Sequence, residues 1–167
     1  MVFSGSLTSF PRDIKLLIGI FLFVLSTGFI SALQFVNVTT EASPRGIQEN
    51  YLGNEEDLEA EEMKFAKNEK QLLSILHTHI LSMAVIFFIL SLLVASTNLS
   101  GGLKKFLMVE PLLSVLFTFG GIYLLWKGVL WMRFVVMASG ALMTFSFMVS
   151  VVLIYWELLK KSVSKNS

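Results

Sequence analysis

The chain has 167 residues, of which 54% are hydrophobic and only 15% are charged, and its mean hydropathy is +0.73. A soluble domain of this size does not need so many apolar residues, so the composition indicates an integral membrane protein. Cysteine is absent, which excludes disulfides, thiolate catalysis and cysteine-ligated metals. The net charge of +1 says little about function, because acidic and basic residues are segregated along the chain.

Four apolar runs are long enough to cross a membrane. The hydrocarbon core of a bilayer is about 30 Å thick and a helix rises about 1.5 Å per residue, so roughly 20 apolar residues form a span. The predicted spans are residues 14–36, 72–95, 106–126 and 129–156. The first run is too long for a signal peptide, so we expect an uncleaved span. The sequence therefore predicts an all-α integral membrane four-helix bundle in a single domain of residues 1–167.

The third and fourth spans are separated only by Lys127 and Gly128, which predicts an antiparallel hairpin with a tight turn. Glu110 and Pro111 interrupt the third span. Either Glu110 caps a helix that starts at Pro111, or the helix begins near Leu103 and bends at the proline; we prefer the earlier start. For the carboxylate, we prefer a helix cap with lysines nearby over a proton relay.

Basic residues near the ends of the spans predict the orientation in the membrane. Most of them fall on one side, and we expect that side, with both termini, to be cytoplasmic. The opposite side receives residues 37–71, which carry nine acidic and four basic side chains. Lys127 and Arg133 also fall there, so the rule is obeyed only in part. The residues on the cytoplasmic side are Arg12, Lys15, Lys104, Lys105, Lys160, Lys161 and Lys165.

The segment 37–71 divides into two parts of different character. Residues 37–54 contain turn sequences, such as the stretch 43–46 (SPRG), and show no helical period. Residues 55–71 are rich in helix formers, and their glutamates precede their lysines, which is typical of a surface helix that runs into the second span. A solvated acidic loop is the alternative, and we prefer it. We interpret the whole segment as a partly helical extracytoplasmic loop and as a docking surface.

Small residues at four-residue spacing predict how the spans pack. Lipid gives helices no hydrophobic reason to associate, so close contact at small side chains and buried hydroxyls must hold the bundle together. Every span contains such pairs. They are Gly28 with Ala32, Ser91 with Ala95, Ser114 with Thr118, Gly140 with Thr144, and Ser146 with Ser150.

The only two histidines, His77 and His79, lie in the second span. Residues two apart on a helix point about 160° away from each other, so the pair cannot clamp one ion or ligate both faces of one haem. With Ser74, Thr78 and Ser82 the histidines form one broad polar arc. We expect this arc to face the interior of the bundle, where hydroxyl and imidazole groups find partners.

Three residues of the later spans lie at the depth of the histidines, which is roughly 8 to 11 Å from the outer face. They are Gly120, Gly121 and Met137. Paired glycines leave room for a flat ring, and methionine offers a soft thioether ligand. A pocket for haem b or a quinone, lined by these residues with His77 and His79, is thus geometrically allowed. Simple packing across the bundle is the preferred alternative, and a metal or proton-transfer role is the third.

The stretch HTHILSMAVIFFIL, with the preceding GIQENYLGNEE and MKFAKNEKQLL, resembles small four-span inner-membrane proteins of bacteria from respiratory gene neighbourhoods. The resemblance covers residues 46–95. It rests on a Thr-His-x-His form of the second span, with His77 and His79 at the histidine positions and Thr78 at the variable one. The resemblance implies a bacterial inner-membrane location and a cytochrome-associated role.

These features predict a non-enzymatic multi-pass inner-membrane protein that is an accessory subunit of a larger respiratory or redox assembly. The alternative is a small haem- or quinone-binding electron carrier that uses His77 or His79. A channel or transporter is disfavoured, because the spans contain few charges and no broken-helix symmetry. The expected partners are the lipid bilayer and other membrane subunits or a second copy. Nucleic acid is not expected, because no basic patch is present.

Overall fold

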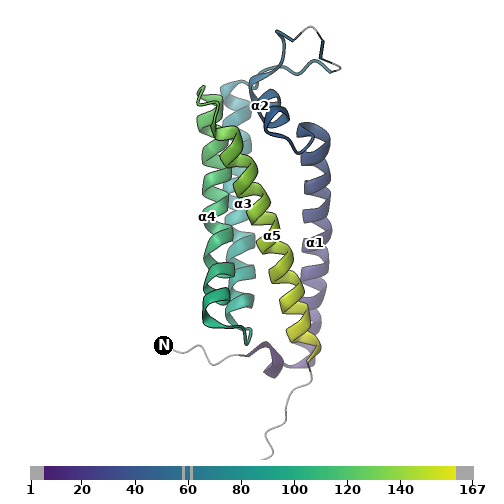
Figure 1. Cartoon of the computed structure of the whole chain (residues 1–167). Coiled ribbons are helices and arrows are strands. Elements are labelled where there is room, and N and C mark those ends of the chain that lie inside the picture. Colours follow the sequence, from purple (N-terminus) through teal and green to yellow (C-terminus); the bar gives the residue numbers. More distant parts are fainter. Residues whose placement is uncertain (1–5, 58, 61, 161–167) are drawn as a thin grey trace, which may run out of the picture.

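The computed structural model describes residues 6–57, 59–60 and 62–160, and within this part of the chain the secondary structure is helical. A short 3-10 helix, η1 (Leu7–Ser9), precedes the α-helices (Figure 1). Four helices are long and apolar enough to cross a membrane, which confirms the predicted fold class. The α-helices are α1 (Arg12–Thr40), α2 (Pro44–Leu52), α3 (Glu69–Ala95), α4 (Gly101–Trp126) and α5 (Met132–Leu159); α2 is the one that is too short to span.

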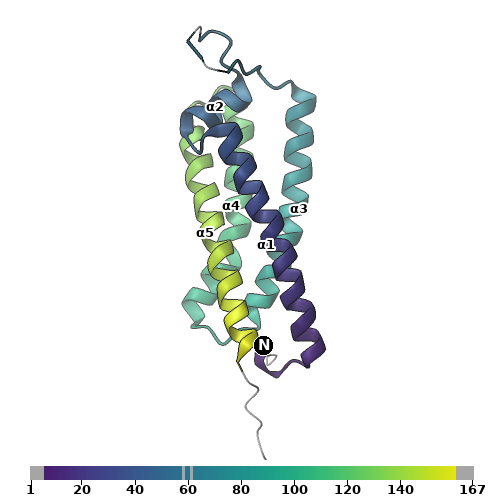
Figure 2. The same ribbon diagram turned by 90° about the vertical axis from the view of Figure 1, so that its right-hand side faces the viewer.

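The four long helices do not contribute equally to the bundle. Helices α3, α4 and α5 pack side by side, and α1 joins them chiefly along α5. In the most apolar stretch of α4 half of the residues are buried, whereas in that of α1 only 17% are buried. Figures 1 and 2 show α2 lying across one end of the bundle and α5 crossing from α4 towards α1. Helix α1 therefore leaves most of its apolar surface for the membrane or for a partner.

The two ends of the bundle carry different structures. The α2 end carries α2 and the described residues of 53–68, whereas the η1 end carries η1, the loop 96–100 and the end of α5. Lys15 Nζ donates to the carbonyl oxygen of Lys160 at 3.5 Å, so the basic residues of the first and last spans share the η1 end. The assignment of this end to the cytoplasm remains a prediction.

Lys104 and Lys105 belong to the first turn of α4 and lie at the same η1 end. Lys104 Nζ donates to the carbonyl oxygens of Ala95 and Thr97, which closes the loop between α3 and α4. Lys161 and Lys165 lie outside the described residues.

Helix α2 occupies a part of the chain in which we predicted no helix, so that prediction is wrong. The Ser43 hydroxyl accepts a hydrogen bond from the backbone N–H of Gly46 at 3.0 Å, and Pro44 lies in the first turn. A serine cap followed by proline is a typical helix start. The helix ends at Gly53, whose φ of 81° is the left-handed conformation that glycine adopts most easily.

Of the two interpretations of residues 55–71, the surface helix is wrong and the loop agrees with the structure, because α3 begins only at Glu69 and the described residues of 53–68 form turns and irregular chain. Asn54 holds this segment in place. Its backbone N–H donates to the carbonyl of Lys64, and its side-chain oxygen accepts from the N–H of Lys64. Local side-chain bonds of this kind compete with helix formation.

Helices α4 and α5 form the predicted antiparallel hairpin. The turn between them includes Gly128, whose φ of 97° disfavours any other residue. Helix α4 runs from Gly101 through Pro111 without ending, in agreement with the earlier of the two predicted starts. Membrane helices tolerate an internal proline when neighbouring groups satisfy the freed backbone. Ser91 of α3 also donates to the carbonyl of Met108 at 2.9 Å, next to the Leu107 carbonyl that Pro111 leaves without its helical donor.

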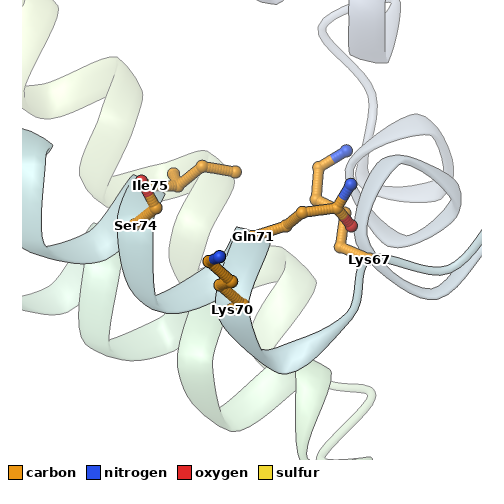
Figure 3. Close-up of a pocket in the computed structure, with 5 residues that line it drawn as sticks. All are labelled: Lys67, Lys70, Gln71, Ser74 and Ile75. Atoms are coloured by element: carbon orange, nitrogen blue, oxygen red, sulfur yellow. The ribbon is translucent and has the colours of Figure 1, made fainter.

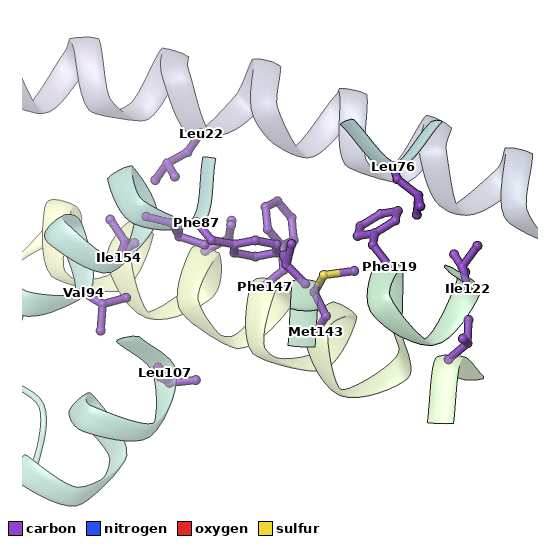
Figure 4. Packing of buried hydrophobic residues seen from close by; sticks show 14 of the residues in the cluster. Leu22, Leu76, Phe87, Val94, Leu107, Phe119, Ile122, Met143, Phe147 and Ile154 are labelled. Carbon is purple, nitrogen blue, oxygen red and sulfur yellow. The ribbon is translucent and has the colours of Figure 1, made fainter. Parts of the chain in front are cut away.

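The apolar core lies between α3, α4 and α5 and reaches one side of α1. Phe147 of α5 stacks on Phe29 of α1 with ring centroids 3.9 Å apart, and it meets Phe87 of α3 edge-on at 6.4 Å. Figure 4 shows Phe87 and Phe147 together in the middle of this core, with Leu22 of α1 close by. These contacts attach α1 to the other three helices.

Small polar residues fill the interfaces of the three central helices, as predicted, but not that of α1. Gly28 and Ala32 are exposed, so the packing pair predicted in the first span is wrong. Helix α1 is held through larger side chains instead. The buried small polar residues of α3, α4 and α5 are Ser91, Ser114, Thr118, Ser139, Ser146 and Ser150.

Candidate functional site

The polar arc predicted on the second span lies on α3 but does not face the interior of the bundle. Ser74, His77, Thr78, His79 and Ser82 are all exposed on the outside. The prediction that the arc faces inward is therefore wrong. We call these five residues the α3 polar face.

The apolar residues of α3 explain this orientation. The buried large side chains of this helix recur at spacings that place them on one side. At about 100° per residue, the centre of that side points about 150° away from Thr78. Large apolar side chains thus occupy the interface with α4 and α5, and the polar residues are left outside. The buried residues are Leu72, Leu76, Phe87, Leu90 and Val94.

His79 is oriented by its own helix and by α4. Its Nδ1 lies 2.8 Å from the carbonyl oxygen of Ile75. A carbonyl only accepts, so Nδ1 carries the proton and the lone pair of a neutral ring is on Nε2. The ring centroid lies 5.3 Å from that of Phe119, with 35° between the planes. The imidazole is thus held at the edge of the α3–α4 interface with Nε2 as its potential ligand atom.

His77 points in a different direction from His79. The two side chains are about 160° apart around α3, and both are exposed. Within the described part of the chain, no side-chain hydrogen bond holds the His77 ring. The two imidazoles therefore do not converge on one ligand. Leu76 precedes His77, so the leading threonine of the Thr-His-x-His form is absent here.

The structure separates the two adjacent glycines of α4. Gly121 is buried, and a Cβ atom there would lie 2.9 Å from Cγ2 of Val136 on α5. Gly120 is exposed, and a Cβ atom there would meet nothing within 4 Å. Gly121 therefore allows α4 and α5 to approach each other closely. Gly120 makes no such contact, and it is the residue next to Phe119, whose ring lies beside His79. Met137 follows Val136 on α5 and is 40% exposed.

A pocket of about 490 Å³ opens at the α2 end of α3, beside the polar face (Figure 3). Its lining includes two lysines, so it carries positive charge. Ile75, which also lines it, is the residue whose carbonyl orients His79. The pocket is therefore suited to an anionic group that approaches the polar face from the water. The lining residues are Lys67, Lys70, Gln71, Ser74 and Ile75.

Lys67 connects this pocket to α2 and to the hairpin. Its Nζ donates to the side-chain oxygen of Asn50 at 3.3 Å and lies 5.5 Å from the centroid of the Tyr51 ring. Its carbonyl accepts from Nε1 of Trp126 at 2.8 Å. Burial lowers the pKa of Lys67 and raises the pKa of Tyr51 from 10.0 to about 12. The lysine is thus fixed from two sides rather than freely solvated.

Glu110 does not cap a helix, so that prediction is wrong. It lies within α4, is only 7% exposed, and its Oε1 accepts a hydrogen bond from Ser114 at 2.5 Å. Its Oε2 is buried without a hydrogen-bond partner in the described structure. The sequence pattern that indicates a buried carboxyl group is a glutamate four residues before a serine, in an apolar run that continues past a proline.

The described residues contain no group of three or more histidine, aspartate or glutamate side chains that could hold a metal ion. If the chain held a haem, His79 Nε2 would be the atom available to bind the iron, because Nδ1–H is fixed by a carbonyl in the manner of metal-bound imidazoles. His77 cannot supply the second ligand to the same haem. That ligand would have to come from elsewhere, such as another molecule.

Comparison with known proteins gives a match to a family model. A family model described as a transmembrane helical domain matches residues 41–165. This region includes the α3 polar face, the hairpin and Glu110. No curated protein and no solved structure matches the chain. Because the family model covers more than half of the sequence, the chain belongs to this family of transmembrane helical domains.

Proposed function

We propose that this multi-pass membrane protein is a non-enzymatic accessory subunit, and that its α3 polar face packs against a membrane-spanning helix of another subunit in a redox assembly. The observation that carries the proposal is the exposure of His77, Thr78 and His79 on the outside of a span. Exposed imidazoles and hydroxyls have no hydrogen-bond partners in lipid, whereas a neighbouring helix can supply them.

The low burial of α3 and α1 supports this proposal. In the most apolar stretch of each helix, only 22% of the residues of α3 and 17% of those of α1 are buried, compared with 50% for α4. Two of the four spans thus leave most of their surface available to other helices. The resemblance to inner-membrane proteins from respiratory gene neighbourhoods supports a bacterial inner-membrane location and a redox assembly as the partner.

Photo-crosslinking in native membranes tests the proposal. A photoreactive amino acid at Thr78 should crosslink to a different membrane protein. The same group at Leu116 of α4 or Val152 of α5, which are 60% and 64% exposed, should not. An equal yield at all three positions would contradict the proposal, and so would a crosslink at Thr78 only to a second copy of this chain.

Substitution of the polar face gives an independent readout. A variant with both His77→Leu and Thr78→Leu should still insert, because leucine is favourable in a span. It should, however, migrate alone on a native gel of the solubilised membrane instead of with its partner. Unchanged migration as part of a larger complex would show that another surface makes the contact.

The orientation of His79 favours a second candidate function, a small haem- or quinone-binding electron carrier. Its Nε2 is free for a ligand, and the lysine-lined pocket at the end of α3 could pair with the carboxylates of a haem. Absorption spectra of the oxidised and reduced protein test the haem form directly. A Soret band that His79→Ala abolishes supports it, with His77→Ala as the comparison. Protein from haem-replete cells without such a band excludes it.

A further inference from the structure

Glu110 places a carboxyl group inside the hydrophobic part of the bundle. It is the tenth residue of α4, a helix of 26 residues, and therefore lies about 13 Å from the start of a rod about 39 Å long. If α4 is centred in a hydrocarbon core of about 30 Å, the carboxyl group lies about 9 Å inside it. An ionisable group at such a depth is rare and is usually functional.

Hydroxyl groups of the facing helix lie at the same level. The hydrogen bond between Thr118 and Ser139 sets the register of α4 against α5. Glu110 is about 12 Å from Thr118 towards the η1 end, and Ser146 and Ser150 are about 10 and 16 Å from Ser139 in the same direction. The carboxyl group is therefore level with the interval between the two serines.

On α4 and α5, three oxygen atoms are buried without a hydrogen-bond partner in the described structure, and they lie at this level. They are Oε2 of Glu110 and the hydroxyl oxygens of Ser146 and Ser150, and both serines are 0% exposed. Buried polar atoms are normally satisfied, because each unsatisfied one destabilises the fold by about 1–3 kcal/mol. The three atoms thus point to a missing partner between α4 and α5.

No basic side chain supplies this partner in the described structure. On α4, Lys104 donates to backbone carbonyls of the α3–α4 loop and Lys105 is exposed, and on α5 Lys160 pairs with Glu157 at 2.9 Å. The groups that face this level are the hydroxyls of α3, α4 and α5, which do not ionise near neutral pH. An ionised carboxylate in this position would carry an uncompensated charge in a medium of low dielectric constant.

We propose that Glu110, Ser146 and Ser150 form an intramembrane site for one positive charge, held as a proton or as a sodium ion. One carboxylate neutralises one monovalent charge. Carboxylate and hydroxyl oxygens are the hard ligands that such ions prefer. Ser114 orients the carboxyl group by its bond to Oε1, which leaves Oε2 to hold the charge.

Labelling with dicyclohexylcarbodiimide tests the site, because this apolar reagent reacts with protonated carboxyl groups in apolar surroundings. The purified protein in mild detergent, free of sodium, should be labelled at Glu110 about tenfold more than at Glu157, as read by mass spectrometry. Glu157 is the internal control, since it is 3% exposed but paired with Lys160.

Two arms of the experiment identify the ion. Protection of Glu110 by sodium chloride, but not by choline chloride at the same pH, indicates a sodium site. Protection by rising pH alone indicates a proton site. In the sodium case a Ser146→Ala and Ser150→Ala double variant should be labelled like the native protein but should lose the protection.

Two results would overturn the proposal. One is labelling of Glu110 no greater than that of Glu157. The other is labelling that responds neither to pH nor to sodium. Glu110→Gln keeps the size of the side chain and should lose the label while keeping the thermal unfolding midpoint within a few degrees of the native value. A second readout is the effect of sodium on that midpoint, which should vanish in Glu110→Gln if sodium is the ion.

Discussion

Thr118 of α4 and Ser139 of α5 share a buried hydrogen bond of 2.7 Å between their hydroxyl oxygens. Ser139 also bonds to the carbonyl of Val135 at 2.7 Å. A hydroxyl has only one proton, so Ser139 donates to Val135 and accepts from Thr118. This direct polar bond between two predicted spans fixes the register of the hairpin.

Thr118→Val should weaken the hairpin. Valine keeps the shape of threonine but removes the donor, and hydrogen bonds between membrane helices contribute about 0.6 kcal/mol on average, up to roughly 2. We expect the free energy of unfolding in lipid micelles to fall by that amount. In a double-mutant cycle with Ser139→Ala, the second substitution should have a smaller effect than it has alone.

Thr144→Val is the matched control for this experiment. The Thr144 hydroxyl donates to the carbonyl of Gly140 on its own helix at 2.9 Å, so it joins no two spans. Its substitution should change the free energy of unfolding by less than that of Thr118. Equal effects would show that the interhelical bond does not contribute to stability.

The adjacent glycines of α4 should respond in opposite ways to alanine. Gly121→Ala places a Cβ atom 2.9 Å from Cγ2 of Val136, whose rotamer is restricted in a helix. We expect a loss of about 1–3 kcal/mol from overpacking. Gly120→Ala meets open space and should stabilise the helix by about 0.5–1 kcal/mol. Thermal unfolding of both variants in the same detergent measures the difference.

Removal of the valine side chain should rescue the first variant. Val136→Ala opens the space that the new methyl group needs, so the double variant should be more stable than the sum of the two single changes predicts. If Gly121→Ala is as stable as Gly120→Ala, the two helices are not in close contact at this position.

The length and hydropathy of the sequence were sufficient to predict the four spans and the hairpin. These properties depend on local composition, and a run of apolar residues cannot remain in water. The orientation of α3 could not be predicted in this way. The rule that polar residues face inward fails here, because Leu76 and Phe87 fill the interface and leave Thr78 outside.

The remaining errors have local causes. Helix propensity favours a helix over residues 55–71, but the side-chain bonds of Asn54 hold the chain in a turn. The stretch 43–46 has turn residues, but Ser43 acts as a helix cap and Pro44 begins a helix there. Glu110 beside a proline has the sequence of a helix cap. Its burial depends on the partner helices, which the local sequence does not identify.

Trp126→Phe should loosen the segment between α2 and α3. Trp126 Nε1 donates to the carbonyl of Lys67 at 2.8 Å, and phenylalanine cannot donate, so about 1 kcal/mol of local stability should be lost. Hydrogen exchange of residues 62–70 should accelerate several-fold. Trp131→Phe is the control, because that side chain is 60% exposed and should leave the exchange unchanged. Equal exchange in both variants would contradict the proposed role of Trp126.

The contact of Tyr51 with the bundle should fail at alkaline pH. Burial raises the pKa of Tyr51 from 10.0 to about 12, so the neutral phenol is favoured in the folded state. The contribution of the buried phenol to the free energy of unfolding is fully present below pH 10 and is lost as the pH rises through 12. One pKa unit corresponds to about 1.4 kcal/mol, so the free energy of unfolding should fall by roughly 2 to 3 kcal/mol. Burial lowers the pKa of Lys67, so its deprotonation acts in the opposite sense as the pH rises.

A titration of tyrosinate absorbance isolates this group. The native spectrum minus that of Tyr51→Phe should give one transition with a midpoint near 12, because the same difference cancels Tyr123 and Tyr155. Over the same range, the thermal unfolding midpoint of the native protein should fall more steeply than that of Tyr51→Phe, which has no phenol to ionise. A difference transition near 10.0 would mean that Tyr51 is solvated, and that the bundle does not cover it when the protein is in a membrane or detergent.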